Sequence, residues 1–170
     1  MPTLHACPLS RLSETLAATG AEHLVTFASP GMRADRPAGI DPHRHLVIGV
    51  SDILAACDGH VLADASHVAR LLDFVRAWPR QAPLLIHCYA GISRSTAAIY
   101  ATACALAPER DEDALATALR CAAPSATPNR RIVAIADNLL GRGGRMEAAI
   151  AAIGRGAEAF EGTPFRLGLA

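Results

Sequence analysis

The chain has 170 residues, which suits one domain with a single core and makes two domains crowded. Its 16 basic and 16 acidic side chains give a formal net charge of zero, so no overall basic field favours nucleic acid or an anionic membrane as a partner. All the basic residues are arginines, so a charged phosphate clamp here has to be a guanidinium, which binds two oxygens at once.

The cysteine count indicates a reducing compartment. The chain has five cysteines, an odd number, with no close CxxC pair, which is typical of free thiols. It shows neither a charged-then-apolar leader nor a long apolar span, and we expect a cytoplasmic location. Four of the cysteines are expected to be structural: Cys7, Cys57, Cys104 and Cys121. His43 and His45 have no third ligand beside them, so we predict no metal site.

The first third of the chain predicts one helix, two strands and two loops. Residues 10–19 (SRLSETLAAT) begin with a good N-cap residue and stop before a glycine, as a short helix does. Residues 23–28 (HLVTFA) and 45–50 (HLVIGV) are apolar runs typical of buried strands. Residues 29–44 are rich in Pro, Gly, Asp and Arg, and residues 51–64 lack regular apolar spacing, so both are predicted loops.

The remainder is predicted to be mainly helical around one more strand. Residues 84–87 (LLIH) form a short apolar run of the kind buried in parallel sheets. Helical spacing or helix punctuation marks five stretches: residues 65–78, 93–107, 111–122, 128–140, with Pro128 in the first turn, and a last helix after residues 141–144. Strands alternating with helices predict an α/β fold, a small mainly parallel sheet covered by helices on both faces.

We expect a single domain over residues 1–170. Residues 144–170 are expected to be appended to it as a C-terminal helix and a less regular tail. The pattern gives no signal for the oligomeric state.

The loop after residues 84–87 has the features of an anion site. In HCYAGISRS the cysteine, Cys88, follows a central strand and the next helix begins a few residues later, so the loop lies between the two. Its amides can turn inward as a nest, and Gly91 permits the close approach that such a cradle needs. These dipoles would stabilise a thiolate at Cys88. Arg94, on the first helical turn, can donate hydrogen bonds to two phosphate oxygens at once.

Neighbouring residues are assigned supporting parts. The residues predicted to hold the phosphoryl group are Tyr89, Ala90, Gly91, Ile92, Ser93 and Ser95. Ser95 can also offer its hydroxyl to a departing sulfur, and His87 can fix the loop by bonding backbone carbonyls. Cys104 and Arg110 repeat the spacing, but they lie at the end of a predicted helix, with a proline and no glycine between them. We therefore predict no anion site at that second pair.

HCYAGISRS resembles the signature of the cysteine-dependent protein tyrosine phosphatase superfamily, in its compact dual-specificity branch. PSATPNR, residues 124–130, resembles the segment that opens a late helix in that branch, and the resemblance covers about residues 24–140. It implies a metal-independent phosphomonoester hydrolase without a cofactor, acting through a phosphocysteine on a phosphorylated protein or a small phosphoester. The family uses a cysteine nucleophile, an arginine clamp and a separate aspartate, and Cys88 and Arg94 match the first two.

Three aspartates compete for the part of general acid: Asp52, Asp58 and Asp64. We favour Asp52, because it follows the strand 45–50 and the carboxyl ends of parallel strands open on one edge of a sheet. Asp58 precedes a glycine and is expected in a turn, and Asp64 is suited to the N-cap of the next helix.

The loop carries no charge between its cysteine and its arginine, which favours a phosphoprotein or a small phosphoester over a highly charged inositol phosphate. Four arginines have two interpretations. They line a substrate groove, or they lie at helix ends, where they complement the helix dipole or face solvent: Arg130, Arg131, Arg142 and Arg145. Two rival functions use the same cradle. One is a phosphate-binding pseudophosphatase without turnover, and the other is a sulfur- or arsenic-handling redox enzyme, which needs a resolving thiol.

Overall fold

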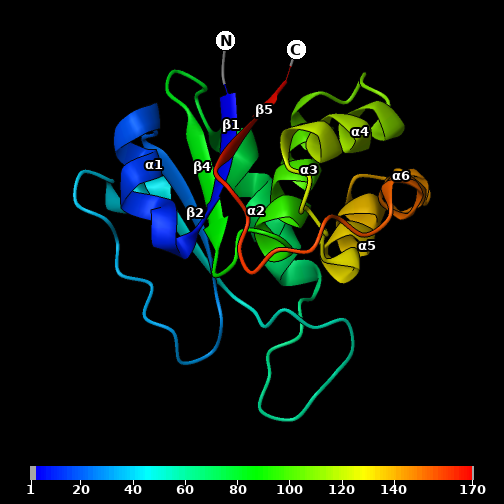
Figure 1. The fold of residues 1–170 in the computed structure, drawn as a ribbon, viewed down its shortest axis with the longest axis horizontal. Coiled ribbons are helices and arrows are strands. Elements are labelled where there is room, and N and C mark those ends of the chain that lie inside the picture. The colour runs from blue at the N-terminus through cyan, green and yellow to red at the C-terminus, as the bar shows by residue number, and fades with distance from the viewer. Residues whose placement is uncertain (1–2, 170) are drawn as a thin grey trace.

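A computed structural model describes residues 3–169 as a five-stranded sheet packed with six α-helices (Figure 1). The strand order is β3-β2-β4-β1-β5. Neighbours among the first four strands pair in parallel, and β5 is antiparallel to β1. The strands are β1 (Thr3–Pro8), β2 (His23–Ala28), β3 (His45–Gly49), β4 (Leu84–Cys88) and β5 (Phe165–Gly168).

Helices cover both faces of the sheet, as the sequence predicted. They are α1 (Leu12–Thr19), α2 (Ala65–Ala77), α3 (Arg94–Leu106), α4 (Glu112–Ala122), α5 (Arg130–Leu139) and α6 (Arg145–Ile153). α1 lies alone on one side of the sheet, and the other five helices lie on the opposite side (Figure 1). Alternate side chains of each strand point to opposite faces, so β4 sends Leu85 to the smaller core under α1 and Ile86 to the larger core.

The central strand and helix are the most deeply buried elements. All five residues of β4 are buried, which explains why it is an uninterrupted apolar run and not an alternating one. In α3 every residue from Arg94 to Cys104 is buried, because α3 packs between the sheet and the helices α2, α4 and α5. Its frequent alanines let these neighbours approach closely. The loop that joins β4 to α3 is therefore held on both sides by rigid, packed elements.

The two terminal strands correct the sequence-based picture. We predicted no strand before residue 10, yet β1 pairs with β4, and the final residues, expected to be irregular, form β5 at the edge of the sheet. The first helix is also shorter than predicted, because Leu9–Arg11 form a 3-10 turn before α1 begins at Leu12. Ser10 caps no helix, and its hydroxyl donates to Glu161 Oε2 at 2.8 Å.

The start of α5 is another correction. We expected Pro128 in the first turn, but the helix begins at Arg130 and Asn129 is its N-cap. The Asn129 side-chain oxygen accepts hydrogen bonds from the amides of Arg131 and Ile132, both at 3.1 Å. The asparagine therefore satisfies two of the amides that open every helix.

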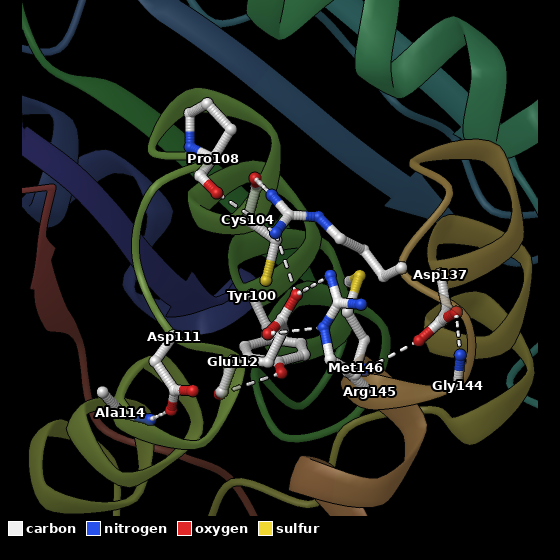
Figure 2. Close-up of polar contacts among 11 residues, drawn as sticks. Tyr100, Cys104, Pro108, Asp111, Glu112, Ala114, Asp137, Gly144, Arg145 and Met146 are labelled. Carbon is white, nitrogen blue, oxygen red and sulfur yellow. Dashed lines mark hydrogen bonds and ion pairs between the residues drawn. The ribbon is translucent and has the colours of Figure 1, made fainter.

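An ionic cluster around the buried Glu112 joins α4, α5 and α6 (Figure 2). Arg142 Nη1 lies 2.8 Å from Glu112 Oε1, and Arg145 approaches the same carboxylate at 3.1 Å. Burial opposes ionisation of Glu112, but the hydrogen bond from Arg145 and the two positive charges hold its pKa below its usual value. Asp137 accepts from the amides of Gly144 (2.6 Å) and Met146 (2.7 Å), and so fixes the turn into α6.

Two long loops, residues 29–44 and 50–64, leave the same edge of the sheet, where β2, β3 and β4 end (Figure 1). The loops were predicted at 29–44 and 51–64, so the structure adds Val50 to the second and a short 3-10 turn at Pro42–Arg44 to the first. No helix in residues 3–169 is both long enough and apolar enough to cross a bilayer.

Candidate active site

Cys88 lies at the carboxyl end of β4, in the middle of the sheet, and only 2% of its surface is exposed. After five intervening residues α3 begins at Arg94, so the strand, loop and helix follow each other as predicted. The N-cap residue of α3 is Ser93, whose hydroxyl bonds no helix amide. The amino end of α3 thus keeps its amides available beside the sulfur.

The loop is held from outside through its carbonyl groups. Four of them accept backbone hydrogen bonds of 2.8–3.2 Å from residues widely separated in the chain: Tyr89 O from Leu9, Ala90 O from Gly162, Ile92 O from Thr127, and Ser93 O from Asn129. Within residues 3–169, no amide from position 89 to 94 donates to a backbone carbonyl outside the helix and strand ladders. Carbonyls that face outward leave the amides free to face an anion, which is the arrangement of a nest.

Gly91 is required by this packing. Its φ is 69°, in the left-handed region, and a Cβ there would lie 2.6 Å from the nitrogen of Pro8. The end of β1 therefore forms the backing of the loop. The glycine was selected from sequence for its conformational freedom, whereas the strand that it packs against was missed.

Arg94 is buried, with 4% of its surface exposed, and its described partners are all neutral. Nη1 donates to Val50 O at 2.8 Å and to Ser29 Oγ at 2.9 Å, which aims the side chain across the carboxyl edge of the sheet. Nε is buried without a hydrogen-bond partner, and no carboxylate in residues 3–169 pairs with the group. A buried cation without a counter-charge is costly, so the site is prepared for an anion.

Two serines of the stretch have separate contacts. Ser95 Oγ lies 3.2 Å from Cys88 Sγ, so its hydroxyl can donate to a thiolate. Ser93 Oγ donates to Asp52 Oδ1 at 2.7 Å. Only the first contact was expected from the sequence.

Asp52 is the one of the three candidate aspartates whose carboxylate bonds to this loop. It is exposed, follows β3 closely, and accepts from both Ser93 and Asn129 Nδ2, the latter at 2.8 Å. Asp64 caps α2 as predicted, and the hydroxyl of Ser66, followed by the amide of His67, lowers its pKa to about 2. Asp58 is exposed in a turn before Gly59.

Asn129 was missed as a site residue. It is buried, its side-chain oxygen caps α5, its amide nitrogen holds Asp52, and its backbone nitrogen bonds the loop at Ser93 O. The sequence signal was the PNR of residues 128–130, which we used only to open a helix. Asn129 therefore connects α5, the 50–64 loop and the loop of Cys88, the first two through its side chain and the last through its backbone.

His87 bonds a side chain of β2 and not the backbone carbonyls that we expected. Its Nε2 lies 2.8 Å from Thr26 Oγ1, and the same hydroxyl lies 2.8 Å from His45 Nε2. Burial lowers the pKa of His87 to about 4, opposed by a backbone contact at Cys88, and burial followed by Arg36 also lowers that of His45. His87 is therefore neutral at pH 7.

The other cysteines divide into two groups. Cys7 and Cys104 are buried, and burial raises the pKa of Cys7 to about 11. Cys57 and Cys121 are exposed, which corrects the expectation that they are structural. None of the five is disulfide-bonded, and the described residues contain no cluster of three His, Cys, Asp or Glu side chains able to hold a metal ion.

Comparisons with known proteins agree with this geometry. Residues 57–123 match the family described as protein-tyrosine phosphatase. Among solved structures, DUSP15 is 16% identical, with a TM-score of 0.63 over 89% of this chain and 92% of that one. A mouse putative dual specificity phosphatase complexed with zinc tungstate is 20% identical, with a TM-score of 0.61 over 86% of each chain.

Human DUSP28 is also 20% identical, with a TM-score of 0.59 over 78% of this chain and 85% of that chain. No curated protein matches the chain. At these identities the solved structures establish the fold, and the family match adds the segment that includes Cys88 and Arg94.

Proposed function

We propose that this chain hydrolyses phosphomonoesters through a phosphocysteine, because residues 57–123 match the protein-tyrosine phosphatase family and the fold is that of compact dual-specificity phosphatases. The substrate class is a protein phosphorylated on tyrosine, serine or threonine, or a small phosphoester. The observation that carries the proposal is Arg94, a buried guanidinium with neutral partners and an unpartnered Nε beside the loop of Cys88.

In the first step the Cys88 thiolate attacks phosphorus. A sulfur–phosphorus bond forms as the ester oxygen–phosphorus bond breaks, and Asp52 donates its proton to the leaving oxygen. Arg94 and the amides of residues 89–94 hold the three other oxygens, on which charge is spread during transfer. The 2.7 Å bond from Ser93 supports this role for Asp52, because it ties the carboxylate to the loop that binds the phosphoryl group.

In the second step water cleaves the phosphocysteine. The Asp52 carboxylate accepts a proton from water as its oxygen attacks phosphorus, and the sulfur leaves as a thiolate. Ser95 supports this step, since its hydroxyl at 3.2 Å can donate to the departing sulfur. The enzyme returns to its starting state with inorganic phosphate as product, and no metal takes part in either step.

The loop favours substrates of moderate charge. Tyr89, Ala90, Ile92 and Ser93 are uncharged, so the site offers one guanidinium to one phosphoryl group. A phosphorylated side chain or a simple phosphoester is matched by that charge, whereas an inositol polyphosphate would leave its additional phosphates without cations in the loop.

Hydrolysis of an activated aryl phosphate tests the proposal. We expect turnover by the parent protein, inhibition by vanadate, and loss of turnover in Cys88→Ser. Equal rates for parent and variant would refute the mechanism. Vanadate binding without turnover by the parent would instead favour a phosphate-binding pseudophosphatase.

Replacement of each aspartate separates the candidates for general acid. Asp52→Asn is expected to lower kcat about 10²-fold, as loss of a positioned acid typically does. Asp58→Asn and Asp64→Asn should retain the parent kcat at neutral pH. An unchanged kcat in Asp52→Asn would remove that residue from the mechanism.

A further inference from the structure

The surface beside the loop of Cys88 forms a groove. The ligand that we assign to this groove below rests on the proposed function of the Cys88 site. Three shallow depressions of about 410, 290 and 390 Å³ adjoin one another. The first includes Ile92 of the loop and shares Thr127 and Arg155 with the second. The second shares Arg130 and Ile150 with the third. We call this surface the α5–α6 groove.

Its wall next to the loop is the segment 154–164, which runs from α6 back toward the carboxyl end of β4 (Figure 1). Gly162 of this segment donates to Ala90 O at 2.8 Å, and Gly156 N donates to Thr127 Oγ1 at 3.1 Å. Phe160 lines the first depression and is 90% exposed, the most exposed of the large apolar side chains in residues 3–169. The groove is thus continuous with the rim of the candidate active site.

The charged side chains that line the second depression indicate which kind of ligand binds there. Arg130 and Arg155 both line the second depression, which has no acidic side chain, whereas Glu158 lines the first depression and Glu147 the third. The Arg130 side chain has no hydrogen bond or ion pair to another described residue, and that of Arg155 has only an exposed 3.6 Å pair with Glu158, of the kind that contributes little stability. Both cations therefore remain available to an incoming anion.

The other arginines considered from sequence have structural partners. Arg142 and Arg145 bind Glu112 in the cluster of Figure 2, and Arg131 Nε donates to Ala63 O at 2.6 Å. Of the four, only Arg130 is left at the groove. It is the first residue of α5, where the helix dipole adds to its positive potential.

We infer that the α5–α6 groove binds the part of a phosphoprotein that flanks the phosphorylated residue, as an extended segment with an acidic side chain between Arg130 and Arg155. The phosphoryl group enters the loop at Cys88, the neighbouring residues cross the depression beside Phe160, and the carboxylate reaches the two arginines. Apolar residues of the peptide contact Ile150 and Pro128. The preferred substrate is therefore an acidic phosphoprotein segment.

The experiment compares two phosphotyrosine peptides, one with flanking aspartates and glutamates and one with asparagines and glutamines in their places. We expect the parent to have the higher kcat/KM on the acidic peptide. In the double variant Arg130→Glu/Arg155→Glu, the ratio of kcat/KM on that peptide to kcat/KM on an aryl phosphate should fall about tenfold, as reversal of two exposed charges at a binding surface does. Arg76→Glu, an exposed reversal at the far end of α2, should leave the ratio unchanged.

Equal kcat/KM of the parent on the two peptides, or an unchanged ratio in the double variant, overturns the inference. Binding of fluorescent versions of both peptides to Cys88→Ser separates this result from failure of the proposed function, because it requires no turnover. Loss of the acidic preference when Arg130 and Arg155 are reversed in Cys88→Ser supports the groove even if the parent is inactive. Tighter binding of Cys88→Ser to vesicles containing phosphoinositides than to the acidic peptide assigns the two arginines to a membrane and overturns it.

Discussion

The helix α3 separates two cysteine–arginine pairs of identical spacing, and the contrast between them explains why one is a candidate active site. Cys88 and Arg94 lie at its amino end, whereas Cys104 is in its last turn and Arg110 lies beyond it. The amino end presents amides, and the carboxyl end presents carbonyls. Arg142 takes one of these, donating to Cys104 O at 2.7 Å, and burial raises the pKa of the Cys104 thiol to about 12. The cysteine–arginine spacing alone therefore does not identify an anion site. The end of the helix at which the pair lies determines whether amides are available to an anion.

The sharpest test of this contrast is alkylation at pH 7. With a pKa of about 12, only ~10⁻⁵ of the Cys104 side chain is thiolate, so iodoacetamide should leave it unmodified. Cys88 should react, and vanadate should protect it. Peptide mapping by mass spectrometry distinguishes both from the exposed Cys57 and Cys121. Modification of Cys104 before Cys88 would reverse our assignment.

Replacing the arginine of each pair by lysine is expected to give the next largest difference in activity. Arg94→Lys removes the fork that binds two phosphoryl oxygens and is expected to lower kcat/KM on an aryl phosphate about 10²–10³-fold. Arg110, whose Nη1 donates to Gly168 O at 3.2 Å, should tolerate the same change with nearly parent activity. Equal losses in the two variants would show that the helix end has no influence.

The pH dependence of stability tests the strand that leads into Cys88. Unfolded His87 binds a proton below about pH 6.5, whereas the folded side chain does so only near pH 4. The stabilisation is therefore complete above pH 6.5 and is lost as pH falls through 4, by about 3 kcal/mol. His87→Gln should flatten the urea-unfolding free energy across this window. His43→Gln, in an exposed turn, should retain the parent slope, and an equal slope in His87→Gln would contradict the prediction.

The smallest expected effect is a single methyl group behind the loop. A Cβ at Gly162 would lie 2.8 Å from Gly91 O, so Gly162→Ala should cost about 1–2 kcal/mol of stability and lower turnover by displacing the loop. Gly168→Ala, in β5 with open space around it, serves as the control. Thermal unfolding and aryl phosphate turnover are the measurements. Equal behaviour of the two variants would show that the 154–164 segment does not support the loop.

The sequence was informative where structure is determined locally. Residues 84–87 are apolar because β4 is buried, and the residues from Cys88 to Arg94 carry their own turn chemistry in Gly91. Asp64 capped its helix as predicted for the same reason. Short-range preferences were sufficient at each of these positions.

What was missed depends on partners far away in the chain. β1 is a strand because Leu4 pairs with Leu84, and β5 because it pairs with β1, and no local pattern contains these pairings. Asn129 bonds Asp52 across 77 positions, and Gly162 bonds Ala90 across a similar distance. Each requires the folded chain before its role can be identified.

The four outward-facing carbonyls of the loop after Cys88 have a consequence for the chain during its synthesis. Their donors span the molecule from Leu9 to Gly162, so during synthesis the nucleophile emerges from the ribosome long before the last of its supports. During translation Cys88 would lie in an incomplete site. The chain would become catalytically competent only when nearly the whole protein has been made.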